Sequence, residues 1–131
     1  MLDDAIYFQT IRELGARLKS RSLSPVALTE GCLDRLEKLG PKFNAVVTVM
    51  RDSGLRDARK AEDEIRRGHY HGPLHGIPFG VKDLMATREA PTTWGAEPYR
   101  NQHFDYDAAV VERLRAAGAV LVAKLAMVAG R

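Results

Sequence analysis

A short apolar segment at residues 119–123 limits the possible folds of this chain more than any other feature. It reads Ala-Val-Leu-Val-Ala, so no polar side chain alternates with the apolar ones. A strand with this pattern is buried on both faces, which is typical of a parallel sheet. A strand expected at 77–82 and a helix expected at 107–117 precede it, in the order of a βαβ unit. The sequence therefore predicts an α/β fold.

Cap and turn residues indicate where the other elements begin and end. Ser24 is a strong N-cap and Pro25 suits the first helical position, so a helix is expected to start there. The Gly40-Pro41 pair is expected to end this helix. The remaining expected elements are a helix over 10–21, a strand over 43–50, a helix over 53–67, a long irregular segment at 84–106, and the helix at 107–117 with Asp107 as its N-cap.

The expected sheet is small for the kind of strand it contains. Only three strands are indicated, and a strand buried on both faces needs neighbouring strands and helices around it. A sheet of this size leaves edges and apolar faces uncovered. We therefore expect helices packed on a sheet that is incomplete in this chain. The fold is expected to continue beyond Arg131 or to be completed by a complementing chain or a second copy.

Composition excludes several classes of protein. The 131 residues correspond to one domain or to a piece of a larger one. The net charge is only +3, and basic residues do not cluster as a nucleic-acid surface requires. No apolar run approaches the roughly 20 residues of a membrane span. The single cysteine, Cys32, is expected to be a small buried hydrophobe, and its lack of a disulfide partner fits a reducing, cytoplasmic compartment.

The segment 72–83, GPLHGIPFGVKD, passes through an expected strand and contains a lysine near its end. Lys82 follows Phe79 and Val81, and burial among such side chains would favour its uncharged form. An uncharged lysine accepts a proton, so Lys82 is the candidate catalytic base. The alternative is a lysine at a strand end whose ammonium group reaches water. Asp83 is expected to face the other way and to bind the backbone of the following loop.

Other polar clusters give weaker signals. His69, His71 and His75 lie close together in an expected loop, but no carboxylate or cysteine partner is evident for a metal site. The glycines lack the spacing of a phosphate-binding loop. Neither a metal ion nor an organic cofactor is therefore expected. The threonines at 92–93 are expected to satisfy local backbone groups in a turn, while Trp94 either packs or lines an entrance.

Several segments, in order, resemble the amidase signature family. They are "LSPVALTEGCLDRLEKLGPKFNAVVTV" at 23–49, "GPLHGIPFGVKD" at 72–83, "PTTWGA" at 91–96 and "DYDAAVVERLRAAGAVLVAK" at 105–124. The resemblance covers nearly the whole chain. It implies that residues 1–131 are the N-terminal portion of a single amidase domain, with a helical entry at 1–68 and the lysine strand, loop and βαβ unit at 69–131.

The resemblance also implies a chemistry. The family hydrolyses carboxylic amides with a Ser–cis-Ser–Lys triad, whose lysine corresponds to Lys82 and which needs no cofactor. Its serines lie in a Gly/Ser-rich segment downstream of the expected last strand, whereas this chain has no serine after Ser53. We therefore expect the chain to be inactive alone and to act on a small amide only when completed.

The sequence after the last expected strand departs from the family. Many members read "GKTNM-x-EFA" where this chain has AKLAMVAGR at 123–131. This departure makes the amidase subunit of a glutamine-dependent aminoacyl-tRNA amidotransferase the second choice, after an amide hydrolase. A third possibility, from another class, is a non-catalytic remnant or a module that completes the sheet of a partner.

Overall fold

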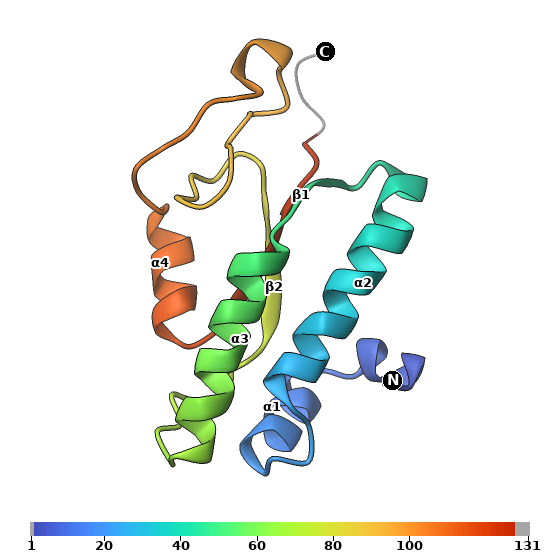
Figure 1. Cartoon of the computed structure of the whole chain (residues 1–131), viewed down its shortest axis with the longest axis vertical. Helices are drawn as coiled ribbons and strands as arrows, with labels where there is room; N and C mark the ends of the chain where they lie inside the picture. The colour runs from blue at the N-terminus through green and yellow to red at the C-terminus, as the bar shows by residue number, and fades with distance from the viewer. Residues whose placement is uncertain (1, 128–131) are drawn as a thin grey trace.

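The computed structural model describes residues 2–127 and has an α/β architecture (Figure 1). A three-stranded mixed sheet lies between helices, as the sequence predicted. The last few residues of the segment that departs from the family pattern, 128–131, lie outside the described part. The elements are η1 (Asp4–Phe8), α1 (Ile11–Lys19), α2 (Pro25–Phe43), β1 (Val46–Val49), α3 (Arg51–Arg66), β2 (Pro78–Lys82), η2 (Glu97–Tyr99), α4 (Ala109–Ala116) and β3 (Val120–Leu125).

The strand order is β1-β3-β2, so the strand that comes last in sequence is central. β3 is parallel to β2, which confirms the βαβ unit, and antiparallel to β1. Val122 packs with Leu33 of α2 and Ala58 of α3. Leu121 packs instead with Val111 of α4. β3 is therefore buried on both faces, as its continuous apolar sequence predicted.

The N-terminal helices begin where their caps predicted. The Thr10 hydroxyl accepts from the Glu13 N–H and the Glu13 carboxylate accepts from the Thr10 N–H, which forms a capping box at the start of α1. Ser24 accepts from the Ala27 N–H at 3.1 Å, and Pro25 is the first residue of α2. These contacts are local in sequence, so the sequence alone could identify them.

The end of α2 differs from the expectation. Gly40-Pro41 does not stop the helix, which continues to Phe43. Asn44 ends it in the left-handed conformation (φ 50°), and its N–H donates to the carbonyls of the last turn. The strand expected over 43–50 is consequently shorter, because α2 occupies its first residue and β1 spans Val46–Val49.

The expected cap of α4 is also wrong. Ala108, not Asp107, occupies the N-cap position. The Asp107 carboxylate instead accepts from the Arg88 N–H at 2.8 Å and pairs with Arg115 at 3.2 Å. Arg88 lies in the loop before α4 and Arg115 lies in the last turn of α4, so contacts outside the first turn outweigh the local capping preference.

No helix within residues 2–127 is both long enough and apolar enough to cross a membrane.

Candidate functional site

Lys82 is the last residue of β2, and its side chain is exposed. The expectation that apolar neighbours bury it is wrong. Val81 is only 7% exposed and packs into the cluster beneath α4. Side chains alternate along a strand, so Lys82 lies on the opposite face of β2, together with Gly80. β2 is an edge strand, and this face at its end has no covering element among the described residues.

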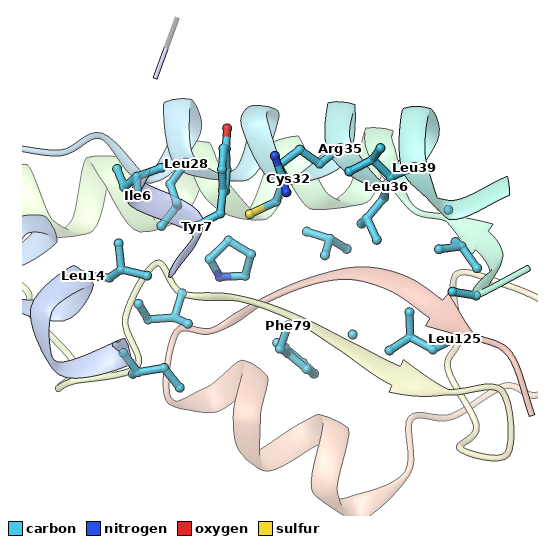
Figure 2. Close-up of a pocket in the computed structure, with 18 of the residues that line it drawn as sticks. Ile6, Tyr7, Leu14, Leu28, Cys32, Arg35, Leu36, Leu39, Phe79 and Leu125 are labelled. Atoms are coloured by element: carbon cyan, nitrogen blue, oxygen red, sulfur yellow. The ribbon is translucent and has the colours of Figure 1, made fainter. Parts of the chain in front are cut away.

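The face that Lys82 shares with Gly80 forms one wall of an apolar groove of about 570 Å³ (Figure 2). β2 and β3 line one side with Phe79, Gly80 and Leu125. α2 lines the other side, and η1 and α1 close one end. Cys32 belongs to this wall, and burial raises the pKa of its thiol, which fits the expected apolar role. Lys82 does not line the groove itself, but its partner in the sheet, Leu125, does.

Asp83 has no exposed surface, and it binds the following loop as predicted. Its carboxylate accepts from the Thr93 N–H at 3.1 Å and also from the Thr93 hydroxyl. Its backbone N–H donates to Leu125 at 2.9 Å, and its carbonyl accepts from Trp94 at 3.0 Å. The Thr93 hydroxyl also accepts from the Gly95 N–H, which confirms the expected turn chemistry. Asp83, the residue after Lys82, is thus held in place by hydrogen bonds to all of its polar groups.

The lysine that is buried is Lys124 of β3, which sequence reasoning missed. It has no exposed surface, and its ammonium group donates to Thr87 at 3.0 Å, to the Pro91 carbonyl at 3.1 Å and to Thr92 at 2.9 Å. The Asp83 carboxylate lies 3.4 Å away. Burial lowers the pKa of Lys124, and Asp83 opposes that shift. A buried charge requires this degree of pairing, because an isolated one is strongly disfavoured.

A sequence signal for Lys124 existed but was weak. The residue directly follows the apolar run 119–123, so extending the strand by one position would have placed a lysine inside the sheet. Its oxygen partners come from a loop more than thirty residues earlier. Their convergence depends on the tertiary fold.

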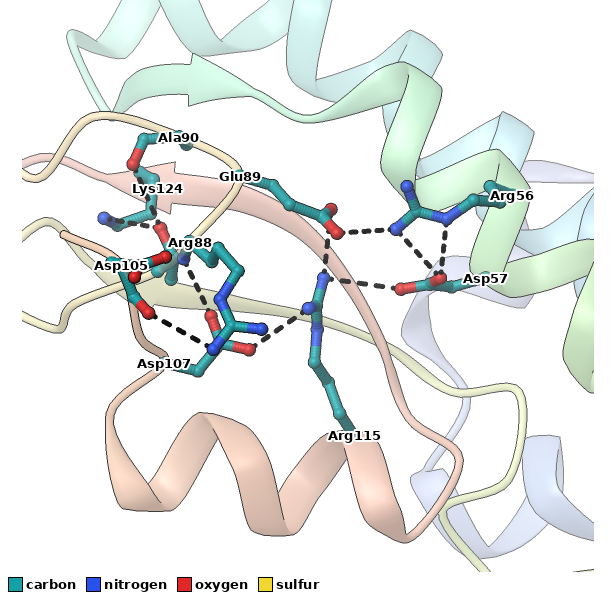
Figure 3. A network of polar contacts seen from close by, with 10 residues as sticks. Arg56, Asp57, Arg88, Glu89, Ala90, Asp105, Asp107, Arg115 and Lys124 are labelled. Carbon is teal, nitrogen blue, oxygen red and sulfur yellow. Dashed lines mark hydrogen bonds and ion pairs between the residues drawn. The ribbon is translucent and has the colours of Figure 1, made fainter. Parts of the chain in front are cut away.

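A network of charged groups surrounds the outer side of this loop (Figure 3). Arg115 of α4 pairs with Asp57 at 3.4 Å, Glu89 at 3.3 Å and Asp107 at 3.2 Å. Arg56 of α3 pairs with Glu89 at 2.7 Å. The network therefore joins α3, the loop and α4.

Two of the three histidines meet a carboxylate that the sequence did not reveal. Glu64 of α3 lies 2.7 Å from Nε2 of His71 and 3.5 Å from Nε2 of His75. These three side chains could surround a metal ion by distance alone. However, Nδ1 of His75 accepts from the His71 N–H at 3.0 Å, so the neutral ring carries its proton on Nε2, the atom that a metal would need. The donor set therefore suits a hydrogen-bonded cluster and not a metal.

The sequence and the fold both match one class of proteins, the amidases. The family model described as Amidase matches residues 27–130. The chain is 45% identical over 128 residues to the putative amidase AmiD of Mycobacterium tuberculosis. The protein belongs to the amidase signature family.

Other relatives span two kinds of amide chemistry. The chain is 39% identical over 119 residues to a subunit of the glutamyl-tRNA(Gln) amidotransferase of Carboxydothermus hydrogenoformans. The crystal structure of peptide amidase from Stenotrophomonas maltophilia superposes on 89% of the chain with a TM-score of 0.84 and 34% identity. The match to AmiD covers 98% of this chain but 27% of AmiD, and the superposition covers 24% of the peptide amidase. The chain thus spans about a quarter of the relatives that it matches.

Proposed function

We propose that residues 1–131 are the N-terminal portion of an amidase domain and that Lys82 is the base of a Ser–cis-Ser–Lys triad. The helical entry is 1–68, and the lysine strand, loop and βαβ unit are 69–131. The serines come from a polypeptide segment outside these residues. The observation that supports this most is the exposure of Lys82 on the face that forms the groove.

The groove suggests that Lys82 is exposed in this chain because the segment that would cover it lies outside these residues. A segment that packs on the apolar wall formed by Gly80 and Leu125 would also cover the end of β2. Covering the Lys82 amine would remove it from water and favour its uncharged form. The segment that brings the serines would then also convert Lys82 into a proton acceptor.

The chemistry follows from those roles. A serine hydroxyl is a weak nucleophile, so the base must remove its proton as the oxygen attacks the amide carbon. Lys82 accepts this proton through the bridging serine and returns it to the nitrogen of the leaving amine. Water then hydrolyses the acyl-enzyme. Backbone N–H groups of the serine segment stabilise the oxyanion.

A chimera tests the proposal. The 131 residues replace the matching segment of AmiD, and hydrolysis of a simple carboxamide is measured. The chimera should be active, and Lys82→Ala should lower turnover by about a thousandfold or more, because the triad members act as a unit. Lys42→Ala, at an exposed lysine on α2, is the matched control and should keep activity. An active Lys82→Ala chimera would refute the proposed base.

The chain by itself should show no amide hydrolysis and no labelling by a serine-directed probe. Its four serines all precede Lys82, and none lies in a Gly-rich loop. Turnover by the isolated 131 residues that disappears in Lys82→Ala would contradict this expectation and show that the site is complete.

The second candidate is the amidase subunit of a glutamine-dependent aminoacyl-tRNA amidotransferase. Relatives named as subunits of glutamyl-tRNA(Gln) amidotransferases support it, with identities of 38% and 43% in two further species. The 45% identity to a putative amidase favours the hydrolase. Glutamine as the preferred substrate of the chimera, over simple carboxamides, would reverse this order.

The third candidate is a non-catalytic module that completes the sheet of a partner. Both outer strands, β1 and β2, have an unpaired edge within the described residues. The test mixes the chain with a partner protein that has no catalytic serine. Formation of a stable complex would support this candidate. For any of the three we propose a cytoplasmic location, on the basis of the unpaired Cys32.

A further inference from the structure

The loop that follows Lys82 is fastened to a single buried cation. The ammonium of Lys124 contacts Thr87, Pro91 and Thr92, and its fourth neighbour is the Asp83 carboxylate. All four acceptors belong to residues 83–92. One side chain of β3 therefore holds both the start and the end of this loop.

Asp83 transmits this constraint to the end of β2. Its carboxylate is held by Lys124 and Thr93, and its backbone is held by Leu125 and Trp94. Every polar group of Asp83 therefore has a partner, which holds the residue in place. Lys82 is its direct neighbour, so the position of the Lys82 backbone follows from the Asp83 contacts.

We propose that Asp83 and Lys124 are positioning residues for Lys82, and that their buried pair fixes both the site and the charge environment of the catalytic lysine. This inference rests on the role of Lys82 given above. Neither residue touches the reacting atoms. They act by holding the end of β2. The Lys124 ammonium also balances the charge of the Asp83 carboxylate, so the pair is neutral.

The charges around the pair define what its removal does. From the α4 side, Asp107 is the further carboxylate that acts on Lys124, and it is itself paired with Arg115. Lys124→Met leaves the Asp83 carboxylate unpaired, although the two donors of Thr93 still stabilise its charged form. Asp83 directly follows Lys82 in the chain, so we expect an unpaired anion at Asp83 to make the Lys82 amine of this variant less reactive. Adding Asp83→Asn removes that anion.

The test measures the reactivity of each lysine in the 131-residue chain. Competitive acylation over a range of pH, followed by peptide mass spectrometry, gives the rate for Lys82 relative to the exposed Lys42. Lys124→Met should lower this ratio at neutral pH by about threefold, the effect of half a pH unit. The double variant with Asp83→Asn should restore it. Lys38→Met, a matched lysine substitution on an exposed face, should leave the ratio unchanged.

A merely structural role predicts the opposite pattern. Two packing changes would disturb the chain more than one, so the double variant would depart further from the wild type than Lys124→Met. An unchanged ratio in Lys124→Met, or a double variant worse than the single one, overturns the proposal. In the wild type and in Lys38→Met, labelling of Lys124 reports opening of the fold, because the residue is buried in the native chain. Circular dichroism reports folding in the two variants that lack Lys124.

A milder variant keeps the proposal testable if Lys124→Met does not fold. Thr92→Val retains both charges and removes one acceptor of the ammonium. The Asp83 amide, which donates to Leu125, should then exchange with deuterium about tenfold faster, while the Met50 amide, which donates to Val122, stays protected. Equal change at both amides, or none, refutes the coupling. Neither measurement uses a substrate or a serine, so its outcome is independent of whether the completed protein hydrolyses amides.

Discussion

His75 is a titratable residue with no exposed surface, and its surroundings favour the neutral ring. Burial lowers its pKa, as does the neighbouring His71, whereas Glu64 acts in the opposite direction. Nδ1 accepts a backbone N–H, so a second proton would have no acceptor there. Acidification therefore places a charge in a site that is built for a neutral group.

Stability should fall as the pH drops through the ordinary histidine value of 6.5, since the unfolded chain then binds a proton that the folded chain does not. The loss cannot exceed about 1.4 kcal/mol per pH unit for one proton. Urea unfolding at several pH values measures it. His75→Gln should flatten this dependence, and His103→Gln, at an exposed histidine, should not. An identical slope in His75→Gln and wild type would contradict the assignment.

Sequence reasoning succeeded for some site residues and failed for others. The structural role of Asp83 was predictable, because strand alternation turns it away from Lys82 and toward the next loop. The exposure of Lys82 was not, since apolar neighbours in sequence do not reveal that an edge strand has an open face. Lys124 was missed because its oxygen partners are distant in sequence.

At the scale of elements, two helices end in the same way. Gly68 after α3 and Gly118 after α4 both have positive φ, 84° and 86°. In each case the glycine N–H donates to the carbonyl three residues earlier, and the next residue donates to the carbonyl five residues before it. Their surroundings differ, because an added Cβ meets nothing within 4 Å at Gly68 but lies 2.3 Å from the His75 ring at Gly118.

Alanine at these two glycines should therefore have unequal effects. Gly68→Ala should cost about 1–2 kcal/mol of unfolding free energy, the penalty of a left-handed L-residue. Gly118→Ala should cost about 1–3 kcal/mol more, because it also displaces the His75 ring. Denaturant unfolding of both variants gives the difference directly. Equal losses would show that the ring moves aside freely.

The boundaries of elements were predictable only where local contacts set them. Ser24 and Pro25 identify the start of α2, and the apolar run identifies β3. Asn44, not Gly40-Pro41, ends α2, because an asparagine in the left-handed conformation can bind the last carbonyls of a helix that tolerates a proline in its final turns. Asp107 fails as a cap since Arg88 and Arg115 are stronger partners for its carboxylate.

At the scale of the molecule, the groove is an uncovered apolar surface. Phe43, at the end of α2, lines it and is 74% exposed. Phe8 is 80% exposed but does not line the groove, so it is a matched reference. Contiguous apolar surface of this kind binds hydrophobic dyes and promotes association.

The isolated chain should bind a hydrophobic dye and self-associate. Phe43→Lys should reduce both the dye fluorescence and the apparent mass in size-exclusion chromatography, because it places a charge at the rim of the groove. Phe8→Lys should leave both nearly unchanged. A monodisperse chain with no dye binding would show that the groove is closed in solution.

The position of β3 has a consequence for how the chain is made. Within residues 2–127, β1 and β2 pair only with β3, which occupies residues 120–125. During translation, neither earlier strand can meet this described partner until residues 120–125 have left the ribosome. The N-terminal helices can form as they emerge, but the sheet forms in a single late event that brings together residues up to eighty positions apart. Until then, the apolar edges of β1 and β2 are free to pair with other chains.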